Sequence, residues 1–316
     1  MLRVRDWKDE LEQAIVNAAA GNRRLETYLR ANVDSVRQLL RGIGPDDTVP
    51  SAGAGACIVF NISCTHVPAL CAESTGMQSA YQNAYDLKKA GNKRQMVDEA
   101  LESACVGCGV GLAKEKIYFG AVETTGTGIR FFGDLCLVMR YRPDWDKDGN
   151  PPVDPTLDQQ TLVLERNSYD LVRAPLLAEV DGSANPDAAR VAIVEDWVAS
   201  WSGQLIDMVA LRVLNELPVE ERRWTSGEIA RVILDDEDYC EVLFPRSFDV
   251  DELMEVRVSA ADAAAESDIT GRERNGEGPG MHELQWRDQR RRARKALAAA
   301  RIPVRIVTTS GRLRGS

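Results

Sequence analysis

A glutamate stands at the head of a strand-like stretch in the segment DYCEVLFPRSFDVDELMEVRV, residues 238–258. The acidic run before it, residues 235–238, stops at Tyr239, and the apolar residues VLF follow Glu241 directly. A carboxylate in this position could act as a catalytic acid at the mouth of a cleft. It could equally be a strand-edge carboxylate in contact with water. The residues around Glu241 leave both interpretations open.

Three of the seven cysteines have a spacing that could bind zinc. Cys71 and Glu73, followed by Cys105 and Cys108, match the C-x-E … C-x-x-C pattern of cytidine-deaminase-like zinc enzymes, in which thiolates hold the metal and the glutamate moves protons. However, the second pair lacks the preceding proline of that pattern, and a helix is expected between the two halves. The alternative is that these are small buried residues at helix ends. A zinc enzyme therefore remains a second hypothesis.

Two further motifs lack the context that their ligands require. Residues 144–150, DWDKDGN, resemble the start of a calcium loop, but the twelfth position is Pro155, where such a loop needs a bidentate glutamate. The segment TTGTG, residues 124–128, leads into a predicted strand, whereas phosphate-binding loops lead into a helix N-terminus. We expect a solvated loop at the first motif and a turn at the second.

Two polar residues lie directly after predicted strands. His66, one of only two histidines, follows a strand in NISCTHVPAL, and Ser168 follows another in LVLERNSYD. His66 could bind a ligand or could bond to the backbone at a helix start. Ser168 could belong to a site or could be a turn residue that bonds to its own backbone.

Length and composition are those of an ordinary globular protein. The chain has 316 residues, long enough for one large domain with extensions or for two modest domains. No apolar run reaches the ~18 residues that a membrane span needs, and the N-terminus has no apolar signal region. An odd number of cysteines without a secretion signal favours reduced thiols. We therefore expect a cytoplasmic protein without a membrane partner.

The net charge of −10 is unevenly distributed. Ten Lys/Arg and two acidic residues from position 281 onwards give the tail +8, so the rest of the chain carries −18. A basic tail on an acidic body suggests contact with nucleic acid or with an acidic partner. The candidate contact residues belong to one predicted helix: Arg290, Arg291, Arg292, Arg294 and Lys295. A solvated helix face is the simpler alternative.

The predicted elements indicate the α+β class. Apolar spacing predicts helices over 7–42, split at Gly21, and over 77–104 and 194–217, and it predicts strands over 56–63, within 116–141 and 160–172, and from Glu241 onwards. Thr225 and Glu228 have the spacing of a capping box. The predicted organisation is an N-terminal helical region at 1–50, a core at 51–262, a linker at 263–282 and a basic helix with a tail at 283–316.

Several of these segments, taken in order, resemble a known family. YFGAV, RFFGDLCLVM and TLVLERNSYD, followed by a strand with a glutamate near its start, resemble the core of bacterial ADP-ribosyltransferase-type toxins over about residues 116–258. The resemblance implies two small packed β-sheets with a cleft for NAD, which is the substrate. It allows for an antitoxin or immunity partner.

The resemblance also implies roles for individual residues. Glu241 would bond to the nicotinamide-ribose hydroxyl and stabilise the ribosyl cation of the transition state. Ser168 would orient the strand and the ribose, and His66 would contact the sugar or the diphosphate of NAD. Arg130 is a second candidate for the diphosphate, because arginine offers phosphate a forked donor.

The sequence departs from the family at two points. Tyr239, the third candidate catalytic residue beside Glu241 and Ser168, stands where the more familiar members have a second glutamate, and no Ser-Thr-Ser is present. The tyrosine argues against modification of arginine and leaves the macromolecular acceptor open. The basic tail would suit a nucleic-acid acceptor through phosphate contacts. A third hypothesis is a non-enzymatic scaffold that binds nucleic acid or a partner protein.

Overall fold

The computed structural model describes residues 5–41, 55–72, 117–139, 161–168, 184–185, 196–201, 204–235, 238–244 and 248–308. It confirms the α+β class: the described strands form one mixed, open sheet, and helices flank it. None of the helices in these ranges is long and apolar enough to cross a membrane.

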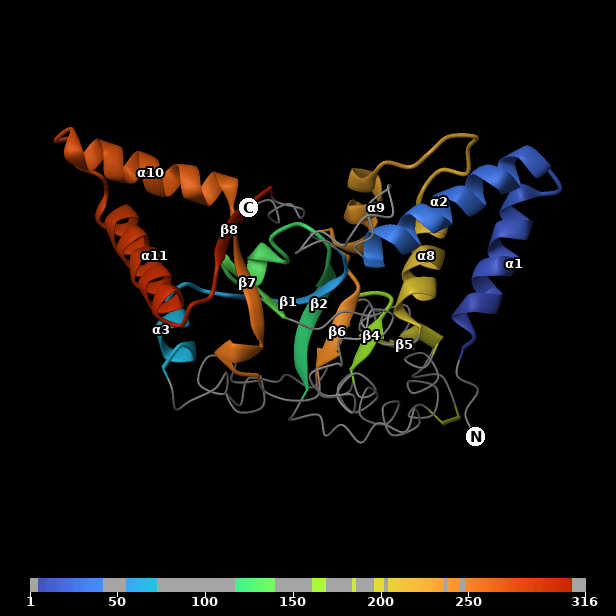
Figure 1. Cartoon of the computed structure of the whole chain (residues 1–316), viewed down its shortest axis with the longest axis horizontal. Coiled ribbons are helices and arrows are strands. Elements are labelled where there is room, and N and C mark those ends of the chain that lie inside the picture. The colour runs from blue at the N-terminus through green and yellow to red at the C-terminus, as the bar shows by residue number, and fades with distance from the viewer. Residues whose placement is uncertain are drawn as a thin grey trace.

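The sheet has eight strands in the order β5-β4-β6-β2-β1-β3-β7-β8 (Figure 1). Its strands are β1 Cys57–Ile62, β2 Tyr118–Glu123, β3 Leu135–Met139, β4 Leu162–Leu164, β5 Val198–Ser200, β6 Glu241–Phe244, β7 Leu253–Ser259 and β8 Val304–Val307. Neighbouring strands pair antiparallel except β7 and β8, which are parallel. All five residues of β3 are buried, as its apolar sequence predicted for a central strand.

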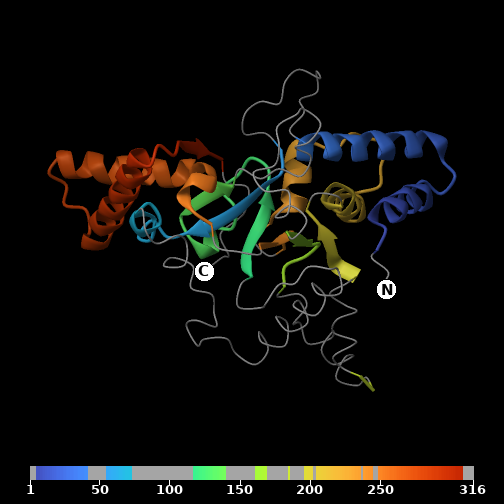
Figure 2. The same ribbon diagram turned by 60° about the horizontal axis from the view of Figure 1, so that its bottom comes forward.

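Two groups of helices lie at opposite ends of the sheet. Helices α1 Trp7–Ala19, α2 Arg23–Arg41, α8 Leu205–Glu216 and α9 Ser226–Ile233 lie towards the β5 end, whereas α3 Val67–Leu70, α10 Ala260–Arg274 and α11 Met281–Ala299 lie towards the β8 end (Figures 1 and 2). The predicted break between α1 and α2 is confirmed, because Ala20 and Gly21 both have positive φ. Short 3-10 turns, η3 Arg130–Phe132 and η6 Val250–Glu252, precede β3 and β7.

One large hydrophobic cluster joins the sheet to the helices at the β5 end. Trp7 of α1 is buried, and its indole N–H donates to the Val198 carbonyl of β5 at 3.1 Å. Phe60, Phe244 and Phe248 stack against one another in the same cluster. A buried aromatic ring removes a large apolar area from water, so these contacts fix the helices on the sheet.

The predicted helix over 194–217 is wrong in its first part. Residues 198–200 form the strand β5, because the backbone N–H of Trp201 donates to Thr161 and that of Glu165 donates to Trp197, at 3.0 and 2.9 Å. Backbone pairing along the sheet edge therefore overrides the helical spacing of the apolar residues. The second part is confirmed as α8, which ends before Pro218.

The predicted linker at 263–282 is wrong over most of its length, because residues 260–274 form helix α10. Ser259 caps this helix by accepting from the Asp262 N–H, and only Ile269 is buried. Its acidic side chains pair with arginines of α11, so few apolar residues are needed to hold it.

Two packed sheets were expected, but every described strand belongs to the single sheet. The predicted capping box of Thr225 and Glu228 is confirmed at the start of α9. The predicted helix at 77–104 and the calcium-like motif lie outside the described residues.

Candidate active site

Glu241 occupies a buried position in the middle of the sheet. It is the first residue of β6, opposite Ala121 of β2 on one side and Leu164 of β4 on the other. Only 3% of its surface is exposed. The prediction that Glu241 heads a strand is confirmed, whereas the alternative of a wet strand edge is wrong, because neighbouring strands cover β6 on both sides.

The structure brings together the three residues predicted to be catalytic. The Ser168 backbone N–H donates to Glu241 Oε2 at 2.8 Å, and the Tyr239 hydroxyl lies 3.4 Å from Glu241 Oε1. Ser168 lies just beyond β4, and Tyr239 precedes Glu241 by two residues, so both approach from strand ends. Their hydrogen bonds fix the orientation of the carboxyl group.

Arg212 of α8 holds the two strand ends beside Glu241. It is buried, forms an ion pair with Asp238 at 3.0 Å, and donates to the carbonyl oxygens of Glu165 and Val232. Burial alone would lower the pKa of Arg212, but neighbouring Cys240, Asp238 and Glu165 raise it above its usual range. The side chain therefore stays charged and ties the segment after β4 to the residues before β6.

Glu241 shares one face of the sheet with further buried polar residues. In successive antiparallel pairs, the row Glu241, Ala121, Val59, Val138 and Glu255 runs across β6, β2, β1, β3 and β7. Directly opposed residues point to the same face, so Glu241 and Glu255 face the same side. Val59, Ala121 and Val138 form a small hydrophobic cluster with Tyr239 between the two glutamates.

Glu123, at the end of β2, is a functional candidate that the sequence analysis missed. It is buried on the same face, two residues from Ala121. Its carboxylate accepts the backbone N–H groups of Thr124 and Gly128 at 2.8 and 3.1 Å. Alternation along β2 could have placed it on the Glu241 face, but the fold was needed to place β2 beside β6.

The TTGTG segment forms a turn, as expected, and the turn is anchored to three strands. Asn61 of β1 donates to the Thr127 carbonyl and accepts from the Ile129 N–H, at 2.9 and 2.8 Å. Arg257 of β7 donates to the Gly126 carbonyl at 3.2 Å. Together with Glu123, these side chains hold the turn against the face that carries Glu241.

Arg130, the second candidate for the diphosphate, lies in η3 and forms an ion pair with Asp262 of α10 at 2.6 Å. Its Nε is buried and has no hydrogen-bond partner. Among the described residues, Arg130 makes no hydrogen bond or ion pair with Glu241. The connection between them runs through Ile129, which packs in the same cluster as Tyr239.

His66, predicted to contact NAD, lies at the start of α3 with its side chain exposed. Its backbone carbonyl accepts from Ala69 and Leu70, and its side chain forms no capping bond. β1 is two strands from β6, about 10 Å away, and Ile62 lies a further ~10 Å along β1 from the row of Glu241. His66 is therefore separate from the Glu241 cluster.

The predicted nucleic-acid residues of α11 differ in their exposure. Arg290 is 1% exposed and pairs with Asp134 and Glu266, so its prediction as a contact residue is wrong because its guanidinium is committed to internal ion pairs. Arg294 is partly exposed and pairs with Glu266 at 2.8 Å. Arg291, Arg292 and Lys295 are exposed.

The zinc hypothesis falls mostly outside the described residues. Cys71 is a half-buried free thiol whose pKa is raised by burial, whereas Glu73, Cys105 and Cys108 are not among the described positions. Within the described ranges, no group of three or more His, Cys, Asp or Glu side chains could hold a metal ion. The described cysteines are all free: Cys57, Cys64, Cys71, Cys136 and Cys240.

No protein-family model, curated protein or solved structure matches the chain.

Proposed function

We propose that the chain is an NAD-dependent, ADP-ribosyltransferase-like enzyme with Glu241 as its catalytic carboxylate. The observation that carries the proposal is the convergence of Ser168 and Tyr239 on the buried Glu241 carboxylate. Ser168 lies more than 70 positions before Tyr239 and Glu241 in the sequence, and the family resemblance pointed to Ser168 and Glu241. A buried carboxylate oriented by hydrogen-bond donors is the preorganised group that a cationic transition state requires.

In this proposal, Glu241 acts on the bond between nicotinamide and ribose. When that bond breaks, nicotinamide leaves with the electron pair and positive charge develops on the sugar. A fixed carboxylate stabilises this charge, as in glycoside hydrolysis. A nucleophilic atom of the acceptor then forms the new bond to C1′ and loses its proton to water.

The neighbouring residues position this carboxylate. The backbone N–H of Ser168 and the hydroxyl of Tyr239 orient its two oxygens, and the Arg212–Asp238 pair fixes the segments that carry them. His66 and Arg130 remain proposed contacts for the sugar or the diphosphate of NAD. The Arg130 guanidinium pairs with Asp262 through Nη2, while its Nε has no hydrogen-bond partner among the described residues and could donate to the diphosphate.

The proposal uses only part of the fold that the resemblance implies. The described strands form one sheet, so the proposal of a transferase-like core is based on the strand that carries Glu241 and its two neighbours, β2 and β4. We further propose a toxin or defence effector that acts in the cytoplasm on a macromolecular acceptor and is controlled by an antitoxin or immunity partner.

The proposal is tested with NAD labelled on its adenylate. Purified wild-type protein and Glu241→Gln are incubated with labelled NAD and with protein, DNA or RNA as acceptors. We expect the wild type to transfer label to one acceptor class. We expect Glu241→Gln to lose about 100-fold or more of that rate, the size of effect seen when one preorganised electrostatic group is removed.

Glu255→Gln is the matched control for this experiment. Glu255 is a buried glutamate on the same face and in the same row of the sheet, but it pairs with Arg257 and Arg305. Equal transfer by wild type and Glu241→Gln, or loss of transfer in a folded Glu255→Gln only, would contradict the assignment of Glu241.

A further inference from the structure

Two phenylalanine rings project into solvent from the turn η3. Phe131 is 64% exposed and Phe132 is 47% exposed, and their ring centroids lie 5.4 Å apart in an edge-to-face arrangement. A soluble protein gains nothing for its own stability by leaving two adjacent aromatic rings in water. Exposed apolar groups of this kind commonly mark an interaction surface.

The turn that carries these rings is held rigidly against β1. A Cβ on Gly133 would lie 2.0 Å from the Ile62 carbonyl carbon, so only glycine allows this approach. Asn61 donates to the Gly133 carbonyl at 3.2 Å and accepts from Ile129 at 2.8 Å, on the two sides of the rings. The exposure of the rings is therefore a fixed feature of the fold.

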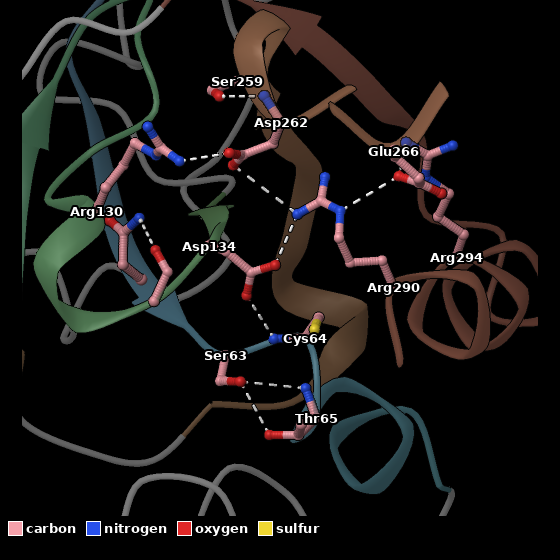
Figure 3. A network of polar contacts seen from close by, with 12 residues as sticks. Ser63, Cys64, Thr65, Arg130, Asp134, Ser259, Asp262, Glu266, Arg290 and Arg294 are labelled. Atoms are coloured by element: carbon pink, nitrogen blue, oxygen red, sulfur yellow. Dashed lines mark hydrogen bonds and ion pairs between the residues drawn. The ribbon is translucent and has the colours of Figure 1, made fainter. Parts of the chain in front are cut away.

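A network of ion pairs connects this turn to helix α11 (Figure 3). Arg130, next to Phe131, pairs with Asp262, and Asp134, two residues after Phe132, pairs with Arg290, each at 2.6 Å. Arg290 Nη1 also lies 3.9 Å from Asp262 Oδ2. The network includes residues on both sides of Phe131 and Phe132 in the sequence, and it ties the turn to α11 through Arg290.

Helix α11 offers exposed cations next to this network. Arg290, Ala293 and Leu297 are buried against the body of the protein, and the neighbouring positions Arg291, Arg292 and Lys295 are exposed. The Arg291 side chain is 77% exposed and has Asp288 at 4.0 Å as a distant partner. These cations belong to the basic segment from residue 281 onwards, which carries +8 although the chain as a whole carries −10.

We propose that Phe131, Phe132 and the exposed cations of α11 form a binding surface for single-stranded nucleic acid. Aromatic rings stack on unpaired bases and cations follow the phosphate backbone, which is the combination that single-strand-binding proteins use. Ile129, at the base of the turn, packs in the same cluster as Tyr239, so the surface is connected to the Glu241 face. The role of this surface as the acceptor site of the transferase rests on the proposed function. Its role in binding single-stranded nucleic acid does not depend on that function.

The test measures binding without NAD. Fluorescence anisotropy follows a short labelled oligonucleotide of mixed sequence, as single-stranded DNA, single-stranded RNA and the matching duplex, with the full chain. We expect both single strands to bind more tightly than the duplex. Phe131→Ala/Phe132→Ala should weaken single-strand binding by about tenfold or more, because each stacked base contributes substantially. Tighter binding of the duplex, or unchanged binding by this variant, would overturn the proposal.

The cations are tested by the dependence on salt. Arg291→Ala/Arg292→Ala should lower the slope of log affinity against log salt by about 1.4, since each phosphate contact to a single strand contributes about 0.7. A slope equal to that of the wild type would contradict the role of these residues. Val219→Ala, which alters an exposed apolar residue elsewhere, serves as the control that keeps binding, and melting curves verify the fold of each variant.

Measuring oligonucleotide binding and nicotinamide release on the same protein distinguishes the failure of this proposal from the failure of the proposed transferase function. Glu241→Gln should bind the single strand as the wild type does. Binding without nicotinamide release would leave the surface established and reject the transferase. Nicotinamide release without binding would leave the transferase established and reject nucleic acid as the occupant of this surface.

Discussion

Two buried glutamates in the same row of the sheet differ in the groups that hold them. Glu241 of β6 is 3% exposed and Glu255 of β7 is 4% exposed, and both side chains point to the same face. The donors described above for Glu241 are the Ser168 N–H and the Tyr239 hydroxyl, which are neutral. Glu255 accepts from Arg257 at 2.7 Å and from Arg305 at 3.2 Å.

The difference shows that burial alone does not identify a catalytic carboxylate. The guanidinium groups beside Glu255 neutralise it, so this residue holds β7, β8 and the turn after β2 together. The Ser168 N–H and the Tyr239 hydroxyl hold the Glu241 carboxylate in one orientation, and a carboxylate that is oriented in advance is suited to stabilising a cation. We therefore propose a chemical role for Glu241 and a structural role for Glu255.

Removal of Arg257 should have the largest effect on stability. Arg257→Ala leaves Glu255 buried with only the half-exposed Arg305 as partner, so we expect the free energy of unfolding to fall by about 3–5 kcal/mol in urea titrations. The double variant Glu255→Gln/Arg257→Met removes both charges and should recover part of this loss. A loss below about 1 kcal/mol for Arg257→Ala would contradict the structural role of the pair.

Removal of one neutral donor should have a smaller effect, confined to activity. Tyr239→Phe keeps the ring in its hydrophobic cluster and deletes the hydroxyl that lies 3.4 Å from Glu241 Oε1. We expect nicotinamide release to fall by about two- to tenfold, the range of a modest hydrogen bond, while the melting temperature changes little. An unchanged rate would show that the hydroxyl does not help to position Glu241.

Replacement of Glu165, whose backbone carbonyl accepts from Arg212, should have the smallest effect on stability. Burial raises the pKa of Glu165 above its ordinary value of 4.5, against the opposing charges of Arg5, Arg212 and Arg166. A raised pKa means that the folded protein binds this proton more tightly than the unfolded chain does. Stability from this group is therefore present below pH 4.5 and is lost as pH rises through the folded pKa.

The variant Glu165→Gln tests whether Glu165 lowers stability as the pH rises. The variant lacks the charged form, so its urea midpoint should decline less than that of the wild type between pH 4 and pH 7, by an amount worth a fraction of a kcal/mol. A wild-type midpoint that rises more steeply with pH than that of the variant would show that the pKa is lowered instead.

The sequence was sufficient to predict the local pattern around both glutamates. Arg257 follows Glu255 by two residues on one strand, so alternation alone places the pair on one face. Tyr239 is related to Glu241 in the same way, and the apolar run of β3 predicted a central strand. These features depend on neighbours in the chain, which a sequence reveals directly.

Other features depend on contacts between distant segments and could not be predicted. Glu123 reaches the Glu241 face only because β2 pairs with β6, and Arg290 is buried only because α10 supplies carboxylates to it. The polar sequence of α10 resembles a linker until its ion pairs with α11 are known. Burial of a charged residue is set by partners that no local pattern identifies.

Nicotinamide release from NAD is the most direct measurement of the central claim. The rates of wild type, Glu241→Gln and Glu255→Gln are compared at equal protein concentration, after melting curves have shown that each is folded. We predict that the wild type and Glu255→Gln release nicotinamide at similar rates and that Glu241→Gln is slower by about 100-fold or more. Equal rates for all three proteins, or no release by a folded wild type, would contradict the assignment of Glu241 as the catalytic carboxylate.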